Sequence, residues 1–313
     1  MSTATAPRRQ TESPGAAPGG TARPPRRRKT HSPYPTWFHL PAGVFYVVLF
    51  LIPTIASFYF SLTRWTLFDV EFIGFDNYVR FFQEQQLIQS FVNTFVYAFL
   101  TSGAKVVLGL LLGVFLSSQI IGRGFLRSVV FFPVLVSTIG VGILFEVLLD
   151  PFDGPVNETL AIFGIEGPGW LTDPNLALFS VAMVDIWAGV GLATLIYIAG
   201  MVAIPQEYFE AAKMDGASAW HSFRHITLPL LQPATVTVVL LSLIGGLRRF
   251  DLIWTMTGGG PGFSSDVLAS VVYKQYQAGF FGLSTAGNVV LFLVVAAIIF
   301  PLSWWLNRKA DDR

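Results

Sequence analysis

The stretch PQEYFEAAKMDGASAWHSFRHITLPLLQP, residues 205–233, is a polar interruption between two apolar segments in the second half of the chain. Residues 206–214 follow a proline and are good helix formers. Gly216 favours a turn, and Ser218 is a candidate N-cap for a second short helix over 219–226. The pattern predicts a helix–turn–helix elbow that is exposed on one side of a membrane.

The elbow also carries a family resemblance. Its run Glu210-Ala211-Ala212, with Gly216, Ile226 and Leu228-Pro229 at fixed distances behind it, resembles the "EAA" coupling loop of bacterial ABC-importer permeases. The resemblance implies a cytoplasmic elbow that docks into a cleft on an ATPase subunit. The coupling residues that it implies are Glu210, Ala211, Ala212, Asp215, Gly216, Ile226, Leu228 and Pro229. An amphipathic loop helix that rests on the bilayer surface is the alternative interpretation.

Composition places the chain in a membrane. Of its 313 residues, 53% are hydrophobic and 12% are charged, whereas soluble domains carry about 25% charged residues. The net charge of +1 gives no basic field for nucleic acid, so no nucleic-acid partner is expected. The chain has no cysteine, which excludes disulfides, thiol catalysis and metal sites built on Cys ligands.

Six apolar segments each approach the ~20 residues that a bilayer-spanning helix needs. They lie at about 43–63, 91–117, 126–149, 177–203, 231–255 and 285–306. The sequence therefore predicts an all-α, polytopic membrane protein with six transmembrane helices. Pro53 predicts a kink in the first segment, and Gly103, Gly109 and Gly113 offer a small-residue packing face in the second.

Charge asymmetry predicts the orientation of these spans. Most Lys and Arg residues lie on the side of the N-terminus and the elbow, whereas the loop 150–176 has none. By the positive-inside rule, both termini and the elbow are cytoplasmic. The basic cluster Arg26–Lys29 could instead belong to a signal peptide, but the apolar run behind it is longer than a usual h-region.

These boundaries divide the chain into four predicted parts. The expected division is a disordered basic cytoplasmic tail 1–36, a first transmembrane helix and outer loop 37–89, an ABC transmembrane type-1 core 90–306 with its coupling loop 205–229, and a cytoplasmic C-terminal tail 307–313.

No catalytic chemistry is predicted on this chain. None of its lysines follows a glycine, so a phosphate-binding P-loop is excluded and any ATP would be hydrolysed by another subunit. His221 and His225 have the spacing of a metal-ligand pair, but neither belongs to an H-E-x-x-H motif and no third ligand is nearby. Two partner-facing or solvated histidines are expected there, and no metal site.

Polar residues within the apolar spans are candidates for a solute path, because charges in a bilayer usually face a cavity or a partner. The candidates are Asp185, Trp187, Arg248, Arg249, Asp251, Trp254 and Asn288. Aromatic faces stack on sugar rings, and carboxylates and amides hydrogen-bond hydroxyl groups. The structural alternative pairs Arg248 or Arg249 with Asp251 and packs the two tryptophans. Lys105 and Glu146 are expected as structural or end-of-span charges.

The outer loop 257–262, Thr-Gly-Gly-Gly-Pro-Gly, predicts a flexible and tightly turning backbone. Together with Phe250–Trp254 and Tyr273, it resembles the sugar-importer branch of the family, closest to the maltose-type or the lactose- or glycerol-phosphate-type first permease. A plain connector is the alternative interpretation of this loop.

The resemblance implies a permease of a binding-protein-dependent importer in a bacterial plasma membrane. It implies a second permease as heterodimer partner, an ABC ATPase dimer that holds ATP-Mg, an extracytoplasmic solute-binding protein, membrane lipid and a sugar substrate, with no cofactor on this chain. Two other classes stay open: an ATP-independent secondary transporter or channel, and a non-transporting membrane scaffold. Co-purification separates them, since only an importer subunit should bring down an ATPase and a second permease.

Overall fold

The computed structural model describes residues 36–118 and 120–311. The basic cluster of the predicted N-terminal tail, Arg26–Lys29, lies outside these residues. By its internal contacts the chain divides into two units, Met1–Leu49 and Phe50–Arg313. The four-part division expected from the sequence stays a prediction.

The first apolar segment forms a run of helical pieces rather than one regular helix. Its elements are η1 (Thr36–His39), α1 (Leu40–Tyr46), η2 (Val47–Leu51) and α2 (Ile52–Phe60). The piece η2 is π-helical and ends just before Pro53, which lies in the first turn of α2. Proline lacks an N–H, which accounts for an irregular turn next to it. The kink expected at Pro53 stays a prediction.

A small hairpin follows, which the all-α prediction missed. Strands β1 (Thr63–Trp65) and β2 (Val70–Phe72) pair antiparallel, and helix α3 (Asp76–Phe81) comes next. The buried Asn77 of α3 donates from Nδ2 to the carbonyl oxygens of Ser61 at 2.9 Å and Thr63 at 2.8 Å. These two bonds fix α3 against the start of the hairpin.

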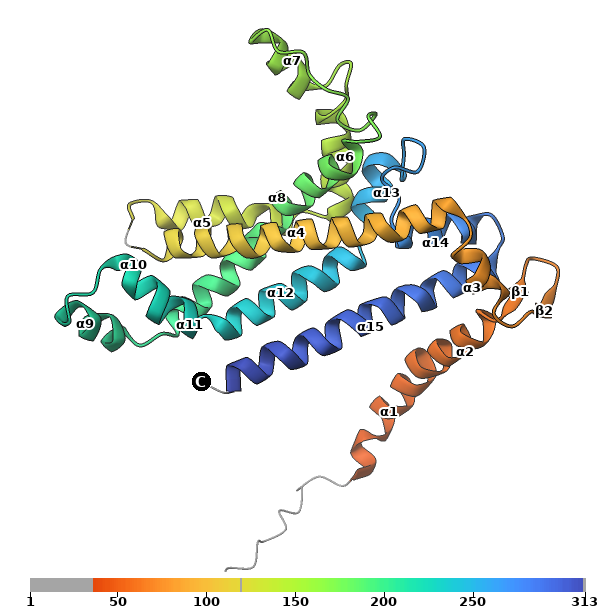
Figure 1. Ribbon diagram of the computed structural model, residues 1–313, viewed down its shortest axis with the longest axis horizontal. Helices are drawn as coiled ribbons and strands as arrows, with labels where there is room; N and C mark the ends of the chain where they lie inside the picture. The colour runs from red at the N-terminus through yellow and green to blue at the C-terminus, as the bar shows by residue number, and fades with distance from the viewer. Residues whose placement is uncertain (1–35, 119, 312–313) are drawn as a thin grey trace, which may run out of the picture. The chain divides into compact units, whose positions relative to one another are not determined.

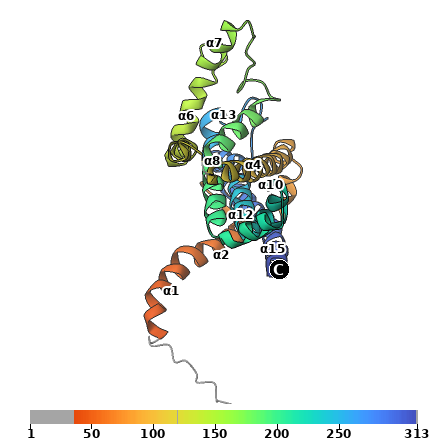
Figure 2. The ribbon, with the colours of Figure 1, turned by 90° about the vertical axis from the view of Figure 1, so that its left-hand side faces the viewer.

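Three long helices form the centre of the second unit. They are α4 (Gln85–Ser117), α8 (Ala177–Val202) and α12 (Gln232–Leu247), and both ribbon views show them packed side by side (Figures 1 and 2). At 1.5 Å per residue, α8 is roughly 39 Å long, more than the ~30 Å hydrocarbon layer.

Glycines set how closely these helices approach. A Cβ on Gly109 would lie 2.7 Å from Ala193 Cβ, and one on Gly113 would lie 2.8 Å from Tyr197 Cβ. The predicted small-residue face is therefore confirmed at these two positions. It is wrong at Gly103, where an added Cβ would meet no described atom within 4 Å.

The third predicted span, 126–149, is broken. It consists of α5 (Arg123–Phe131), η3 (Phe132–Leu135) and α6 (Thr138–Leu148), and the two halves meet at 98°. Pro133 cannot supply an α-helical N–H, and Val136 and Ser137 take extended ψ angles of 140° and 133°. The single helix expected here is wrong for these reasons.

The fifth predicted span, 231–255, also ends early. Helix α12 stops at Leu247 and a separate helix, α13 (Asp251–Thr257), follows. Gly246 lies in the last turn of α12, where a Cβ would come 2.8 Å from Ala98 Cα. The break turns Arg249 toward the neighbouring helix α8, where it forms an ion pair.

The remaining helices lie outside the central three. They are α7 (Pro155–Ile162), α14 (Leu268–Gln277) and α15 (Phe281–Asp311). Within the described ranges, four helices are long and apolar enough to cross a membrane, or up to six if each bent pair counts as one span. The upper number agrees with the six spans expected. The second bent pair joins the residues Ala219–Leu230 to α12 at 64°, so its bend lies at the start of the predicted fifth span.

Buried apolar residues join these elements in separate clusters. One cluster joins α4, α8 and α13 through Tyr97, Val181 and Ile253. Another joins α4 to α12 and α15 through Ala98 and Leu243. The bundle is thus tied together along the length of α4.

Candidate functional site

The elbow forms as a helix, a turn and a second helical piece. Its elements are α9 (Gln206–Met214), α10 (Ala219–Ser222), the π-helical η4 (Phe223–Thr227) and α11 (Leu228–Leu230). Ser218 Oγ accepts a hydrogen bond from the His221 N–H at 3.2 Å, so the predicted N-cap is confirmed. Pro205 occupies the N-cap position of α9, one residue before the first turn expected for it.

Gly216 makes the turn. Its φ is +75°, a conformation that side-chain-bearing residues rarely adopt. Just beyond it, the Ala217 N–H donates to the Ala212 carbonyl at 2.9 Å, which closes the end of α9. An added Cβ on Gly216 would meet no described atom within 4 Å, so backbone conformation and not space favours glycine here.

The elbow presents most of its predicted coupling residues at the surface. Glu210, Ala211, Asp215 and Gly216 are exposed, and Leu228 is 41% exposed. The half-buried members of the set are Ala212, Ile226 and Pro229.

Large apolar side chains are exposed beside them: Met214 is 89% and Trp220 is 68% exposed.

The elbow histidines contact each other. Their rings stack with centroids 4.0 Å apart, and His225 Nδ1 lies 3.0 Å from the His221 carbonyl oxygen. Residues 36–118 and 120–311 contain no group of three or more His, Cys, Asp or Glu side chains that could hold a metal ion. The arrangement is a stacked pair of rings rather than a closed ligand set.

Three charged side chains meet among α4, α8 and the end of α12. Asp185, 2% exposed, pairs through Oδ2 with Lys105 Nζ and through Oδ1 with Arg249 Nη2, each at 2.8 Å. The cluster therefore holds two cations and one anion. Tyr97 Oη and Arg249 Nε are buried beside this cluster. The predicted alternative that pairs Arg249 with Asp251 is wrong, because Arg249 pairs with Asp185. The alternative that pairs Arg248 with Asp251 stays a prediction.

The other candidates for the solute path lie at the surface. Trp187 is 42% exposed and packs edge-to-face on Phe145 with ring centroids 5.2 Å apart. Arg248, Asp251 and Asn288 are exposed, and Trp254 is half-buried. The seven residues therefore separate into a buried ion cluster and a set of exposed side chains.

Aromatic residues gather beside two of these exposed candidates. The Trp254 ring lies 4.9 Å from that of Tyr273, which also packs 5.2 Å from Phe250. A cavity of about 260 Å³ is lined by Phe250, Tyr273, Tyr276 and Asn288, among others. Asn288 is thus brought to the aromatic group from α15, the helix that follows α14.

A polar network that the sequence did not predict anchors the glycine-rich outer loop. Asp266 is fully buried, and its carboxylate accepts from Lys274 Nζ at 2.7 Å and Ser270 Oγ at 2.8 Å. Burial raises the pKa of Asp266, and the hydrogen bonds from Lys274 and Ser270 oppose that shift. Asn93 Nδ2 donates to the backbone oxygens of Ser264 and Asp266, both at 2.9 Å. The turns expected at Gly258, Gly259 and Gly262 are confirmed by their positive φ angles, and the loop is also tied to α4.

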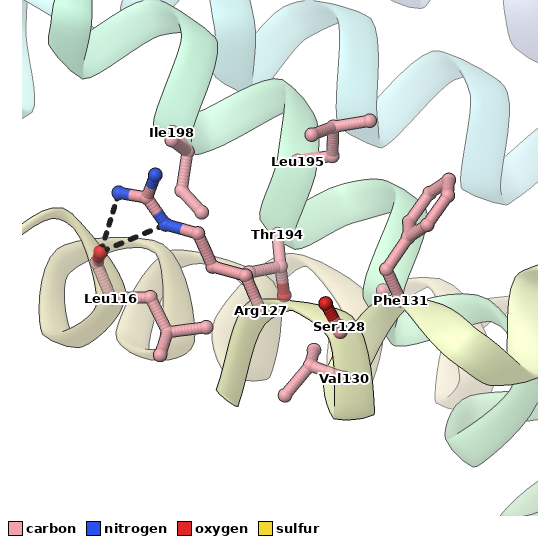
Figure 3. A pocket seen from close by; sticks show the side chains of 9 residues that line it. Leu116, Arg127, Ser128, Val130, Phe131, Thr194, Leu195 and Ile198 are labelled. Carbon is pink, nitrogen blue, oxygen red and sulfur yellow. Dashed lines mark hydrogen bonds between the residues drawn. The ribbon is translucent and has the colours of Figure 1, made fainter. Parts of the chain in front are cut away.

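A small cleft of about 240 Å³ lies where α4, α5 and α8 meet (Figure 3). Arg127 reaches from α5 to the last turn of α4 and donates to the Leu116 carbonyl from Nε at 3.2 Å and Nη2 at 2.7 Å. Carbonyls in the last turn of a helix lack partners within the helix, so Arg127 caps α4. The cleft wall opposite is apolar, with Leu195 and Ile198 of α8.

Known proteins are similar to this chain in sequence and in fold. The trehalose/maltose transport system permease protein MalF of Thermococcus litoralis is 34% identical over 258 residues, which cover 82% of this chain and 88% of that protein. The arabinooligosaccharides transport system permease protein AraP of Bacillus subtilis is 32% identical over 270 residues, which cover 84% of this chain and 85% of AraP. The fold is shared by a chain of a bacterial alginate ABC transporter, which was solved in complex with an alginate pentasaccharide-bound periplasmic protein. The TM-score is 0.78 at 23% sequence identity, and the match covers 87% of this chain and 93% of the transporter chain.

A family model described as "Binding-protein-dependent transport system inner membrane component" matches residues 105–310, which include the broken third span, the elbow and the outer loop. The resemblance drawn from residues 210–229 is confirmed at the level of the family. The chain therefore belongs to the binding-protein-dependent transport system inner membrane components, and it is a multi-pass permease subunit of such an importer.

Proposed function

We propose that this permease imports a sugar, pairs with a second permease, and receives its driving force from a separate ATPase through the elbow. The observation that carries the coupling part is the elbow itself. It projects between α8 and α12 and exposes Glu210, Ala211 and Gly216 on a turn of fixed geometry. The sugar part is supported by relatives whose names specify trehalose/maltose and arabinooligosaccharides.

The elbow can act as a lever because it is short and tied at both ends. Helix α9 is separated from the end of α8 by Ala203–Pro205, and only Leu231 separates α11 from α12, where the chain bends by 64°. A movement of α9 would therefore tilt both bundle helices. In the proposed cycle, ATP-Mg closes a partner ATPase dimer, the dimer moves the elbows of two permeases together, and the path opens outward.

The proposed path is formed by the exposed members of the predicted set, Trp187, Arg248, Asp251 and Asn288, together with the half-buried Trp254. The rings of Trp187 and Trp254 offer flat apolar faces for sugar rings, and Asn288 offers an amide for hydroxyl groups. Asp185 and Arg249 already neutralise each other, so we assign them the role of fixing α8 against the end of α12. The elbow and both termini are proposed to face the cytoplasm.

Reconstitution tests the proposal. The chain is co-expressed with the permease, ATPase and receptor genes beside it, and the purified complex is placed in liposomes with ATP inside. We expect uptake of at least one sugar from a panel of mono-, di- and oligosaccharides, only with ATP and receptor present. An ATPase and a second permease should co-purify with this chain.

Two outcomes would oppose the proposal. Uptake by this chain alone, without nucleotide, would indicate a secondary transporter or channel. A complex that assembles but moves no solute on the panel would favour a scaffold. Glu210→Ala with Gly216→Val provides the matched loss-of-coupling variant, which should keep the complex assembled and abolish ATP-driven uptake.

A further inference from the structure

A groove of about 750 Å³ lies at the ends of α4 and α8 that are farthest from the elbow. Its walls come from the first turns of both helices and from the outer loop at Gly262–Ser264. The elbow follows the other end of α8, roughly 39 Å away along the helix axis. In the proposed orientation, the groove is therefore open to the outside.

The lining of the groove combines neutral amides with apolar side chains such as Val92 and Leu178. Gln85, Gln86, Gln89 and Asn175 contribute side chains from the first turns of α4 and from the start of α8, and the described lining includes no charged residue. Within residues 36–118 and 120–311, the side chains of Gln85 and Gln86 make no hydrogen bond to the protein. Each free amide offers donors and an acceptor, the pairing that a sugar hydroxyl can satisfy in both directions.

Phe263 adds a flat apolar face to this lining. Its ring is 46% exposed, and its φ of +68° is an outlier for a bulky residue. Strained residues persist only where their surroundings hold them, and such residues gather at ligand sites. A ring held in place beside free amides combines the apolar and polar contacts that a small-molecule site needs.

Several contacts hold Phe263 in this conformation. Lys274 Nζ lies 5.2 Å from the centre of its ring, and the same ammonium pairs with the buried Asp266 at 2.7 Å. The Phe263 carbonyl accepts from the Asp266 N–H at 3.2 Å, and the next residue, Ser264, is tied to Asn93 of α4. The network that anchors the outer loop therefore also fixes the ring.

We propose that this groove is an outer sugar subsite, which holds a neutral part of the solute after the receptor releases it and before the solute enters the spans. This inference rests on the proposed function, sugar import. It assigns a binding role to Gln85, Gln86 and Phe263, all outside the predicted path, whereas the Gln89 amide already donates to Asn93 Oδ1 at 2.9 Å. The sugar ring packs on Phe263 while its hydroxyl groups bond the glutamine amides.

The complete transporter in liposomes, with its receptor and ATPase, tests the subsite. Two variants remove the proposed contacts: Gln85→Ala with Gln86→Ala, and Phe263→Asn, since asparagine tolerates a positive φ. We expect sugar moved per ATP hydrolysed to fall about threefold or more, since a single neutral hydrogen bond is worth about that factor. Receptor-stimulated ATP hydrolysis should stay within twofold of the unmodified complex, because the elbow is untouched.

Matched controls are Gln83→Ala, an exposed glutamine outside the lining, and Phe68→Ala, a ring that is 91% exposed in the β1–β2 turn. Both should leave sugar moved per ATP unchanged. If Phe263→Asn lowers the unfolding temperature, the test of the subsite rests on the variant Gln85→Ala with Gln86→Ala. The side chains of Gln85 and Gln86 make no hydrogen bond within the described protein, so their removal should not affect folding.

The outcomes separate the two proposals. If the unmodified complex moves no sugar on the panel, the proposed function fails. If the unmodified complex moves sugar and the glutamine variant matches Gln83→Ala, the subsite is refuted while the function stands. A fall in uptake with an equal fall in ATP hydrolysis would also overturn the subsite, because it would indicate a coupling defect.

Discussion

At the residue scale, Gly216 carries the sharpest prediction. Its φ of +75° costs a non-glycine residue about 1–2 kcal/mol, roughly a 5- to 30-fold change in the population of the correctly bent elbow. Gly216→Val should therefore lower ATP-driven uptake at least severalfold at equal protein level, and Gly216→Asn should do so less. Gly124→Ala is the control, since Gly124 also has open space around it but an ordinary φ. Equal uptake by Gly216→Val and Gly124→Ala would contradict the lever.

A second residue-scale prediction concerns the buried charges. Asp185→Asn leaves Lys105 and Arg249 without a counter-charge, and breaking buried pairs of this kind costs about 3–5 kcal/mol. Lys105→Met should cost less, because the pair between Asp185 and Arg249 survives and becomes neutral overall. Thermal unfolding of the purified complex in detergent measures the loss of stability of both variants. If Asp185→Asn were as mild as Lys105→Met, the two ion pairs would not hold the helices together.

At the element scale, the tight approach of α4 to α8 predicts contrasting effects of the same substitution. Gly109→Ala places a Cβ 2.7 Å from that of Ala193, so the helices must separate, and overpacking of this kind costs about 1–3 kcal/mol. Gly103→Ala meets no described atom within 4 Å and should be neutral. The unfolding temperature of each variant in detergent checks the contrast. A loss of stability for Gly103→Ala alone would locate the packing face elsewhere.

Some features of these elements could be predicted from the sequence and others could not. Apolar length predicts the spans, and the elbow's prolines, Gly216 and Ser218 predict its helix, turn and cap, because these signals are local. The 98° bend after Leu135 and the early end of α12 were missed, since hydropathy averages across a break. The contact between Asn93 and the loop at Ser264 joins residues 171 positions apart, which no local pattern can reveal. The pairing of Asp185 with both Lys105 and Arg249 is of the same kind.

At the scale of the whole molecule, the proposed function requires one orientation in the membrane, and the absence of cysteine makes that orientation testable. The elbow is exposed and carries Lys213, whereas the loop between α6 and α8 exposes Asp153 and has no Lys or Arg. The positive-inside rule therefore predicts that Lys213 lies inside and Asp153 outside. Single variants Lys213→Cys and Asp153→Cys each introduce one thiol. A membrane-impermeant maleimide should label Asp153→Cys in intact cells and Lys213→Cys only after permeabilisation. The reverse labelling pattern would put the elbow on the face opposite to the nucleotide, where no ATPase could move it.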